Sequence, residues 1–403
     1  MRSQESNISR LPVTLTAPGE RALRGGHPWL FDRAIAKVKG RGKVGDLAII
    51  FSYKKNKFIG VGLYDPDSPI RIRVLHQGSP QQIDADFFRA RIAGAKSARA
   101  SLLATDTNGY RLLHGENDGL PGLITDVYAE VAVIKLYSPV WMPWLDLLLP
   151  LIAAAAAAQT VVLRLARNVQ IAAADFGLED GQILRGTLAE EDIVFREHGL
   201  QFIANVVKGH KTGFFLDHRE NRRRIGQLAE GREVLDVFSY AGGFSVHTLG
   251  GGAAAVTSLD ISTPALAQAT RNVELNFGKD RRHETLAEDA FEALERLAKS
   301  GREFDLVIVD PPSFAKRDKE VAGALAAYRK INTLAIPLVA AGGTFLSASC
   351  SARVSSENFF AVVEKCLQAS GRSYELLDKT FHDVDHPIGF PEGAYLKAGY
   401  YRL

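Results

Sequence analysis

The chain is poor in cysteine, has no long uninterrupted apolar run and shows no strong excess of either charge. Its 403 residues include 2 cysteines, Cys350 and Cys366. This number excludes a disulfide framework or a zinc knuckle and suits a reducing cytosol. The longest apolar stretch, VWMPWLDLLLPLIAAAAAA, is broken by Pro143, Asp146 and Pro150. We therefore expect a packed helix with an alanine-rich end and no membrane span.

The overall composition is that of a globular protein with more than one domain. The chain is 46% hydrophobic and 24% charged, and its length favours two or three domains. A formal net charge of +3 permits an anionic partner without requiring one. Basic side chains cluster at Arg219, Arg222, Arg223 and Arg224. The first residues, MRSQESNISR, are polar, so we expect no signal peptide.

Residues 1–80 are predicted to form a small β-rich domain. The short runs VTLTA, DLAIIFS, FIGVGLY and IRIRVL are separated by turn formers. Arg71 and Arg73 alternate with apolar residues, so they form either a phosphate-binding face or an ordinary solvated strand. The segment RALRGGHPWLF contains Arg24, His27 and Trp29. It is either a turn with a core tryptophan or a second RNA-binding element.

Residues 81–194 are predicted to form a small α+β domain. A helix with a basic outer face, DADFFRARIAGAKSARASLL, is followed by two β-runs around a Gly/Asp turn, and the domain ends in a β-hairpin. His114, Glu116, Asn117 and Asp118 are adjacent in that turn. Their glycine neighbours favour side-chain capping over a metal site.

Residues 195–403 alternate between apolar strands and helices, which predicts a parallel, doubly wound α/β sheet. Such sheets bind ligands outside the carboxyl ends of their strands. Asp236, Asp260, Asp310 and Cys350 each fall at the end of an apolar run. The sequence therefore predicts one site that contains three carboxylates and a thiol.

The turn after the first of these strands argues against a dinucleotide. It reads VLDVFSYAGGFS, without the G-x-G-x-x-G pattern that meets a pyrophosphate. Asp236 would repel a phosphate but suits the amino-acid end of S-adenosylmethionine. Asp260 has the spacing of a carboxylate that binds ribose hydroxyls, and Asp289 is placed to meet the adenine edge. Each acid taken alone also fits a helix cap. The cofactor-binding residues predicted in these segments are Asp236, Phe238, Tyr240, Gly242, Gly243, Asp260 and Asp289.

Taken in order, several stretches resemble a known family. They are GHPWLF, GENDGLPGLITDVY, KTGFFLDHRENRR, VLDVFSYAGGFSVHTLGGGA, SLDIS, DPPSFAK, SCS and DHPIGFPEGAYLK. The chain resembles the PUA-domain-containing class I methyltransferases that make 5-methylcytosine in 23S ribosomal RNA. The resemblance implies an N-terminal PUA domain, a central domain with a β-hairpin and a C-terminal Rossmann-like domain. It also implies that further residues line the cofactor pocket, namely Lys211, Thr212, Phe214, Asp217 and Arg219. Asp310 and Pro311 are predicted to bind the cofactor as well.

The thiol and the carboxylate suit carbon methylation of cytosine. Cytosine C5 is a poor nucleophile until a thiolate adds to C6 and creates an enamine-like centre. Cys350 is the predicted nucleophile, and a cationic cofactor would favour its ionisation. Asp310 is predicted to hydrogen-bond the base edge, stabilise charge at N3 and hold the ring. The sequence does not identify the base that removes the C5 proton, and Cys366 fits a core position.

Two other functions stay open. A related methyltransferase acting on a guanine nitrogen would share the cofactor motifs, and a non-catalytic RNA-binding assembly factor would share the fold. The C-terminal segment DVDHPIGFPEGAYLK carries His382, Asp383, Asp385 and His386, which favour a loop near the site over a metal site. We expect no metal, a ribosomal RNA or large-subunit precursor as partner, and a cytoplasmic location. The oligomeric state is left open, with a homodimer among the options. The predicted RNA-binding residues are Arg24, His27, Trp29, Arg71, Arg73 and Arg222.

Overall fold

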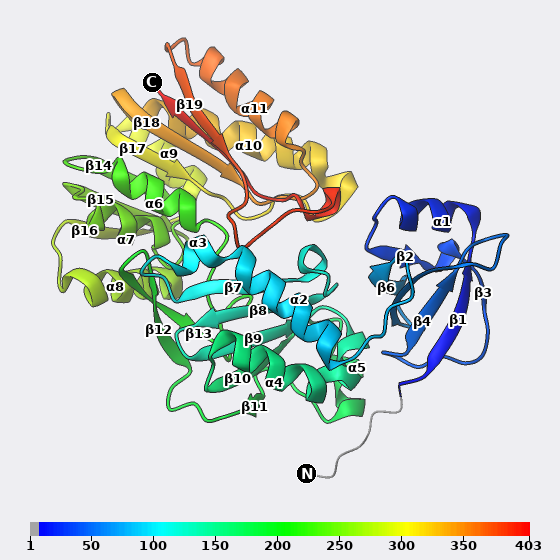
Figure 1. The fold of residues 1–403 in the computed structure, drawn as a ribbon. Helices are drawn as coiled ribbons and strands as arrows, with labels where there is room; N and C mark the ends of the chain where they lie inside the picture. Colours follow the sequence, from blue (N-terminus) through cyan, green and yellow to red (C-terminus); the bar gives the residue numbers. More distant parts are fainter. Residues whose placement is uncertain (1–7) are drawn as a thin grey trace. The chain divides into compact units, whose positions relative to one another are not determined.

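The computed structural model describes residues 8–403, which form two compact units (Figure 1). The described part of the first unit comprises residues 8–195, 204–216 and 384–390, and the second comprises 196–203, 217–383 and 391–403. Most of the polar segment on which the absence of a signal peptide was predicted, residues 1–7, lies outside the described residues. The chain thus passes between the units several times.

The first unit begins with a six-stranded sheet of order β2-β6-β5-β4-β1-β3. Its strands are β1 (Arg10–Leu15), β2 (Trp29–Phe31), β3 (Ile35–Val38), β4 (Leu47–Phe51), β5 (Phe58–Tyr64) and β6 (Ile70–Gln77). The helix α1 (Ala17–Arg24) follows β1 and is capped by Thr16, whose side chain accepts from the Gly19 amide. Val13, Leu30 and Ile72 are buried in the core of the six-stranded sheet, as the alternation of apolar residues predicted.

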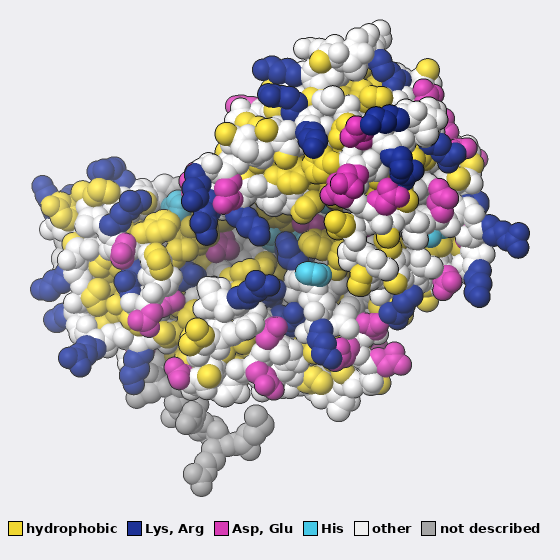
Figure 2. Space-filling model, turned by 180° about the vertical axis from the view of Figure 1, so that it is seen from behind, with side chains coloured by type: hydrophobic (Ala, Val, Ile, Leu, Met, Phe, Trp, Pro, Cys, Tyr) yellow, Lys and Arg dark blue, Asp and Glu magenta, His cyan; other side chains and the backbone are white. Residues whose placement is uncertain are grey.

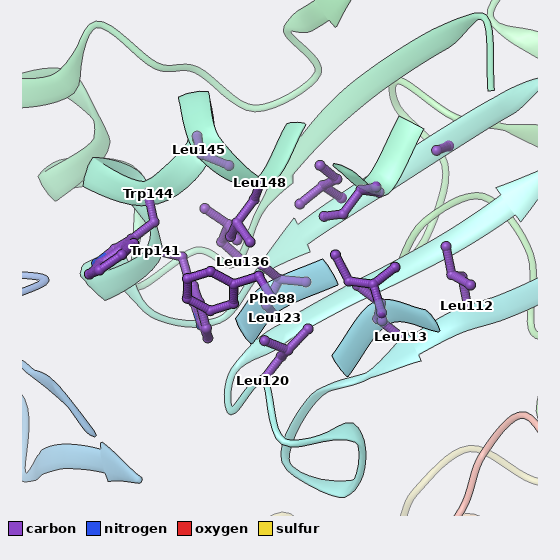
Figure 3. Packing of buried hydrophobic residues seen from close by; sticks show 14 of the residues in the cluster. Phe88, Leu112, Leu113, Leu120, Leu123, Leu136, Trp141, Trp144, Leu145 and Leu148 are labelled. Carbon is purple, nitrogen blue, oxygen red and sulfur yellow. The ribbon is translucent and has the colours of Figure 1, made fainter. Parts of the chain in front are cut away.

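The same unit contains a five-stranded sheet of order β11-β10-β9-β8-β7. Its strands are β7 (Gly109–His114), β8 (Leu123–Tyr128), β9 (Val131–Leu136), β10 (Thr160–Leu165) and β11 (Ile183–Arg185). The helices before and between the strands are α2 (Ala85–Ala98), α3 (Ala100–Leu103), α4 (Leu145–Ala156) and α5 (Gln170–Ala173). Helices α2 and α4 pack together, and Phe88, Trp141 and Leu148 interlock in the core beneath them (Figure 3).

The apolar stretch around α4 is a core element. Within residues 8–403, Pro139–Ala156 is the helical stretch long and apolar enough to cross a membrane by length and composition alone, and half of it is buried. Val140, Trp141 and Ile152 are fully buried in the core of the first unit. The prediction of a packed helix is therefore confirmed.

A two-stranded hairpin, β12 (Asp192–Glu197) and β13 (Leu200–Asn205), follows the five-stranded sheet. Its turn is formed by His198 (φ 50°) and Gly199 (φ 84°), both in the left-handed region that a tight hairpin requires. The hairpin predicted at the end of the central segment is present.

The second unit is built on a seven-stranded sheet of order β16-β15-β14-β17-β18-β20-β19. The strands are β14 (Glu233–Val237), β15 (Ala255–Asp260), β16 (His283–Ala287), β17 (Phe304–Val309), β18 (Val339–Ser349), β19 (Glu375–Thr380) and β20 (Lys397–Arg402). The strands β14 to β18 are parallel, as predicted, but β20 is antiparallel to both β18 and β19. The predicted parallel, doubly wound sheet is confirmed for β14 to β18, and a single strand, β20, runs in the opposite direction to the others.

Helices cover both faces of this sheet. They are α6 (Arg219–Gln227), α7 (Gly243–Gly250), α8 (Thr263–Phe277), α9 (Ala290–Lys299), α10 (Val321–Ala335) and α11 (Ser356–Ala369). Leu235 and Val237 of β14 share a core with α9, α10 and α11. Asp236, between them, points to the opposite face, where it contacts Ser245 of α7. From Val234 to Val237 the strand is therefore buried on both sides, with Asp236 as the one polar residue of that stretch.

Candidate active site

Four chemically active side chains lie at the ends of neighbouring parallel strands. Asp236 lies in β14, Asp260 ends β15, Asp310 follows β17 and Cys350 follows β18. The order of the parallel strands is β15-β14-β17-β18, so these residues meet at one edge of the sheet. Doubly wound sheets bind their ligands at this edge.

The loop from β14 to α7 has a strained backbone. Phe238 (φ 64°) and Tyr240 (φ 49°) adopt the left-handed conformation that non-glycine residues avoid. Such residues cost on the order of 1–3 kcal/mol each and cluster at ligand-binding segments. Gly242 has φ 72° as well, and a Cβ there would lie 2.8 Å from Cβ of Ala269. Gly243 is the first residue of α7, and a Cβ there would lie 2.8 Å from Cδ of Arg222.

Asp236 is buried with one carboxylate oxygen bonded and the other without a partner. Its Oδ2 accepts from the amide (3.1 Å) and the hydroxyl (2.7 Å) of Ser245. Among the described residues, no group hydrogen-bonds Oδ1. Burial, aided by the charges of Asp310 and Asp260, raises the pKa of Asp236 to about 7. A cationic ligand at this edge would favour the charged carboxylate.

At the end of β15, the Asp260 carboxylate lies next to an apolar side chain in the sequence. Its Oδ2 accepts from the Tyr240 amide (2.9 Å) and its Oδ1 from the Ser262 amide (2.8 Å). These bonds fix the carboxylate and leave lone pairs for ribose hydroxyls. The adjacent Ile261 side chain is 72% exposed. An exposed isoleucine beside a fixed carboxylate suits a nucleoside, which has an apolar base and a polar sugar.

Asp289 is the N-cap of α9. Its Oδ1 accepts from the amides of Phe291 (2.9 Å) and Glu292 (3.3 Å). The structure therefore contains the helix cap that the sequence offered as the alternative for this residue. Contact of Asp289 with an adenine edge stays a prediction.

Asp310 faces a histidine that the sequence interpretation overlooked. The Nε2 atom of His218 lies 3.2 Å from Oδ1 of Asp310, and the His218 ring is 5.6 Å from that of Phe244. Burial by itself lowers the pKa of His218, but the neighbouring Asp310 carboxylate outweighs it, so the pKa is raised. The signal was available, since His218 lies between Asp217 and Arg219 in the motif KTGFFLDHRENRR.

Cys350 is partly exposed beside the Asp-Pro-Pro segment. Its Sγ lies 3.9 Å from the carbonyl oxygen of Pro311, the residue after Asp310. Cys366 by contrast is buried in α11, where Sγ contacts the Arg329 carbonyl at 3.6 Å and burial raises the pKa of the thiol. Only Cys350 of the two cysteines is at the ligand-binding edge, so it is the better nucleophile candidate.

A buried lysine holds the segment that follows Cys350. The ammonium of Lys397 donates to the carbonyl oxygens of Ser351 (2.5 Å), Val354 (2.6 Å) and Tyr395 (3.2 Å). Burial lowers the pKa of Lys397 to about 8, and the charge of Cys350 acts in the opposite direction. A cation and a thiol that interact in this way favour the thiolate, the nucleophilic form.

The residues that the family resemblance placed in the cofactor pocket are divided between the units. Asp217 and Arg219 belong to the second, where Asp217 accepts from the Tyr395 hydroxyl (2.9 Å) and Arg219 pairs with Asp383 (2.9 Å). Lys211, Thr212 and Phe214 belong to the first. There the Thr212 hydroxyl donates to Asp126, and the Phe214 amide donates to the Tyr128 hydroxyl (3.1 Å).

Two predicted RNA-binding arginines are buried, and we do not retain them. Arg222 makes a bidentate pair with Glu197, both bonds being 2.7 Å. Burial by itself would raise the pKa of Glu197, but Arg222 holds it well below its usual range. Arg73 is 7% exposed and donates to the Ile70 carbonyl at 3.2 Å. Neither guanidinium is available to a phosphate, because each is buried and hydrogen-bonded to a partner in its own unit.

The other predicted RNA-binding residues lie closer to the surface. The Arg24 side chain is 58% exposed and pairs with Glu20, while Arg71 donates to the Asp65 carbonyl at 3.1 Å. The Trp29 indole donates to Glu116 at 2.8 Å, and His27 accepts from the Trp29 amide at 3.1 Å. On the face shown in Figure 2, Lys and Arg side chains are interspersed with Asp and Glu.

The histidines and acids near the C-terminus are engaged in side-chain networks. Asp385 Oδ2 accepts from the Arg111 amide (2.9 Å), and Oδ1 faces His386 Nδ1 at 2.8 Å. His382 Nε2 accepts from the Leu396 amide (3.1 Å). Between residues 8 and 403, no group of three or more His, Cys, Asp or Glu side chains is arranged to hold a metal ion.

The fold and the site define a doubly wound α/β protein that binds an adenosine-type ligand at the ends of its parallel strands. The chain belongs to the S-adenosylmethionine-dependent methyltransferases: the model of that family matches residues 150–393, and a PUA-like domain matches residues 13–77. The residues fit this cofactor, because Asp236 has an unbonded buried oxygen for which a cation is favourable, and Asp260 lies beside the exposed Ile261.

Curated relatives match over the full length. The "Ribosomal RNA large subunit methyltransferase" of Deinococcus radiodurans is 46% identical over 100% of both chains. The "Ribosomal RNA large subunit methyltransferase I" of Pseudoalteromonas atlantica is 36% identical over 96% of this chain and 97% of its own. Among solved structures, the methyltransferase SMU.776 complexed with SAH has a TM-score of 0.82 at 22% identity, covering 98% of this chain and 100% of its own. That structure supports the fold.

Proposed function

We propose that this protein transfers a methyl group from S-adenosylmethionine to C5 of a cytosine in large-subunit ribosomal RNA. The observation that carries the proposal is the partly exposed Cys350 thiol beside the Asp-Pro-Pro segment, 3.9 Å from the Pro311 carbonyl. The names of the relatives from Deinococcus radiodurans and Pseudoalteromonas atlantica support ribosomal RNA as the substrate. The PUA-like domain supports RNA binding.

The thiol supplies the chemistry that the base itself lacks. The Cys350 thiolate adds to C6, and the electron pair of the C5–C6 double bond moves so that C5 becomes nucleophilic. S-adenosylmethionine, when bound, supplies the electrophilic methyl group that C5 takes up. A base then removes the C5 proton, the Sγ–C6 bond breaks with its electron pair returning to sulfur, and the aromatic ring is restored.

The remaining site residues bind and orient the reactants. Asp236, Asp260 and the strained loop at Phe238, Tyr240 and Gly242 would hold the cofactor. Asp310 would hydrogen-bond the base edge and hold the ring against Cys350. A cytosine that reacts in this way has to be single-stranded or flipped out of its stack. Ribosomal RNA as substrate and a content of 2 cysteines in 403 residues favour a cytoplasmic location.

The test is whether Cys350 forms a covalent bond with cytosine. With large-subunit RNA that lacks the modification, the wild type should form 5-methylcytidine, detected by mass spectrometry of nucleosides. Cys350→Ala should abolish the product, and Cys366→Ala, in the core of α11, should retain it. RNA containing 5-fluorocytidine should trap a covalent complex with the wild type, because fluorine cannot leave as a proton does.

The same assay decides among the alternatives. A guanine-nitrogen methyltransferase would yield a methylguanosine and would tolerate Cys350→Ala. A non-catalytic assembly factor would form no methylated nucleoside and would not bind S-adenosylmethionine in calorimetry. Either result would refute the proposed reaction.

A further inference from the structure

Asn221 and His218 form a hydrogen-bonded chain that leads to Asp310. The Asn221 Oδ1 atom accepts from the hydroxyls of Thr380 (2.6 Å) and Tyr400 (2.8 Å). In this orientation the amide oxygen faces two hydroxyls, both of which donate to it. Its Nδ2 group then faces Nδ1 of His218 at 3.0 Å.

With the amide in this orientation, the Asn221 side chain assigns the proton of the neutral His218 ring to one nitrogen. An amide N–H can only donate, so Nδ1 of His218 has to accept. In the neutral ring the proton is therefore on Nε2, and Nε2 lies 3.2 Å from Oδ1 of Asp310. His218 is 5% exposed, so water does not compete for this contact. Protonation of Nδ1 would require Asn221 to turn, so that its Nδ2 group donated to the two hydroxyl oxygens instead.

The chain ends on the carboxylate of the residue before Pro311, whose carbonyl oxygen lies 3.9 Å from Cys350 Sγ. Asp310 follows β17 directly, and its side chain is 24% exposed. Oδ1 lies 3.2 Å from Nε2 of His218, close enough for electrostatic attraction, although the geometry is not that of a hydrogen bond. The other charged groups that act on His218 are Asp217 and Arg222.

We propose that His218, oriented by Asn221, is a positioning residue that fixes the Asp310 carboxylate for the edge of the target base. This inference rests on the proposed function, because it assigns a substrate contact to Asp310. His218 itself touches neither base nor cofactor in this proposal. Its contribution is the N–H at Nε2, which lies 3.2 Å from Oδ1 of Asp310 and can turn toward it.

Substitution of His218 by Gln or by Asn tests the roles of Nε2 and Nδ1 separately. In His218→Gln the amide nitrogen takes the place of Nε2 and still donates to Asp310. In His218→Asn the amide reaches only the place of Nδ1, so the contact with Asp310 is lost. We expect His218→Gln to keep kcat within about threefold of the wild type, and His218→Asn to lower kcat on the order of 100-fold, as misplacement of a reacting group does.

The readouts distinguish positioning from a loss of structure. Both variants should retain the thermal midpoint and the S-adenosylmethionine Kd of the wild type, so only kcat on RNA falls in His218→Asn. The double variant His218→Asn with Asn221→Leu should be no worse than His218→Asn alone, because both act through one chain. His198→Asn, at a half-buried histidine of the same unit, is the matched control and should keep wild-type kcat.

The outcomes also separate this inference from the proposed function. Equal kcat for His218→Asn and His218→Gln, with 5-methylcytidine still formed by the wild type, would overturn the positioning role alone. Additive losses in the double variant would do the same. If the wild type forms no 5-methylcytidine, or Cys350→Ala still forms it, the proposed function fails whatever His218 does.

Discussion

At the scale of residues, the site contains ionisable groups whose pKa values burial has shifted from their ordinary values. Asp236 is buried with one unbonded oxygen, and its pKa is raised to about 7. Lys397 is buried among three carbonyl oxygens, and its pKa is lowered to about 8. Such shifts in both directions at one edge of a sheet are typical of functional sites.

Asp236→Asn should make the ligand-free protein more stable at neutral pH. The native state keeps the Asp236 proton up to about pH 7, whereas the unfolded state loses it near pH 3.8. The stability contribution of Asp236 is therefore greatest below pH 3.8 and falls as pH rises to 7. At about 1.4 kcal/mol for each pKa unit, the loss is about 4 kcal/mol.

Urea unfolding between pH 4 and 8 measures this difference. The advantage of Asp236→Asn over the wild type should grow with pH and level off above pH 7, while S-adenosylmethionine binding weakens. Asp305→Asn, near the amino end of β17, controls for the loss of a carboxylate elsewhere in the sheet. A difference between Asp236→Asn and wild type that is constant with pH would contradict the shift.

At the scale of elements, the turn between β14 and α7 determines where the cofactor can lie. Three residues of this turn, Phe238, Tyr240 and Gly242, have positive φ. The turn is fixed from outside by the bond from the Tyr240 amide to Asp260 (2.9 Å). One strained turn therefore couples the ends of two adjacent strands.

Gly242→Ala should destabilise the protein and weaken cofactor binding. The new Cβ would lie 2.8 Å from Cβ of Ala269, and φ would stay at 72°. We expect a loss of about 1–3 kcal/mol in the free energy of unfolding and at least tenfold weaker binding of S-adenosylmethionine in calorimetry. Gly323→Ala is the matched control: it lies inside α10 with nothing within 4 Å of the new Cβ, so it should stabilise by about 0.5–1 kcal/mol. Equal effects of the two substitutions would contradict the role of the turn.

The sequence predicted the elements well where periodicity alone decides them. The apolar runs that end at Asp236, Asp260 and Asp310 are strands of one parallel sheet. The apolar pattern of a strand does not show in which direction it runs in the sheet. The antiparallel strand β20 was therefore not predicted. Contacts between residues distant in the chain could not be predicted either. Arg222 was predicted to bind RNA because the neighbouring sequence gives no sign that it pairs with the buried Glu197.

At the scale of the whole molecule, RNA binding is predicted for the domain at residues 1–80, whose boundaries stay predictions. Arg24, on α1, has the most exposed side chain of the arginines that the sequence assigned to this role and retains that exposure although it pairs with Glu20. Contacts of such side chains with phosphates release counterions, so the affinity falls with salt.

Arg24→Ala should weaken RNA binding and make it less sensitive to salt. Loss of one phosphate contact reduces the slope of log affinity against log salt by about 1. Filter binding of large-subunit RNA between 50 and 200 mM salt measures the slope, a range over which phosphate contacts change affinity by about 10³-fold or more. Arg89→Ala, an equally exposed arginine of α2, is the control and should keep the wild-type slope. An unchanged slope in Arg24→Ala would remove this residue from the RNA-binding surface.

The segment 384–390 has a consequence for how the protein is made. It belongs to the first unit, where Asp385 is fully buried and bonds the Arg111 amide, yet 167 residues (383 − 216) of the second unit separate it from the preceding part of the first. During translation most of the first unit leaves the ribosome long before its last piece does. The Arg111 amide therefore lacks its Asp385 partner until the 167 intervening residues have been synthesised.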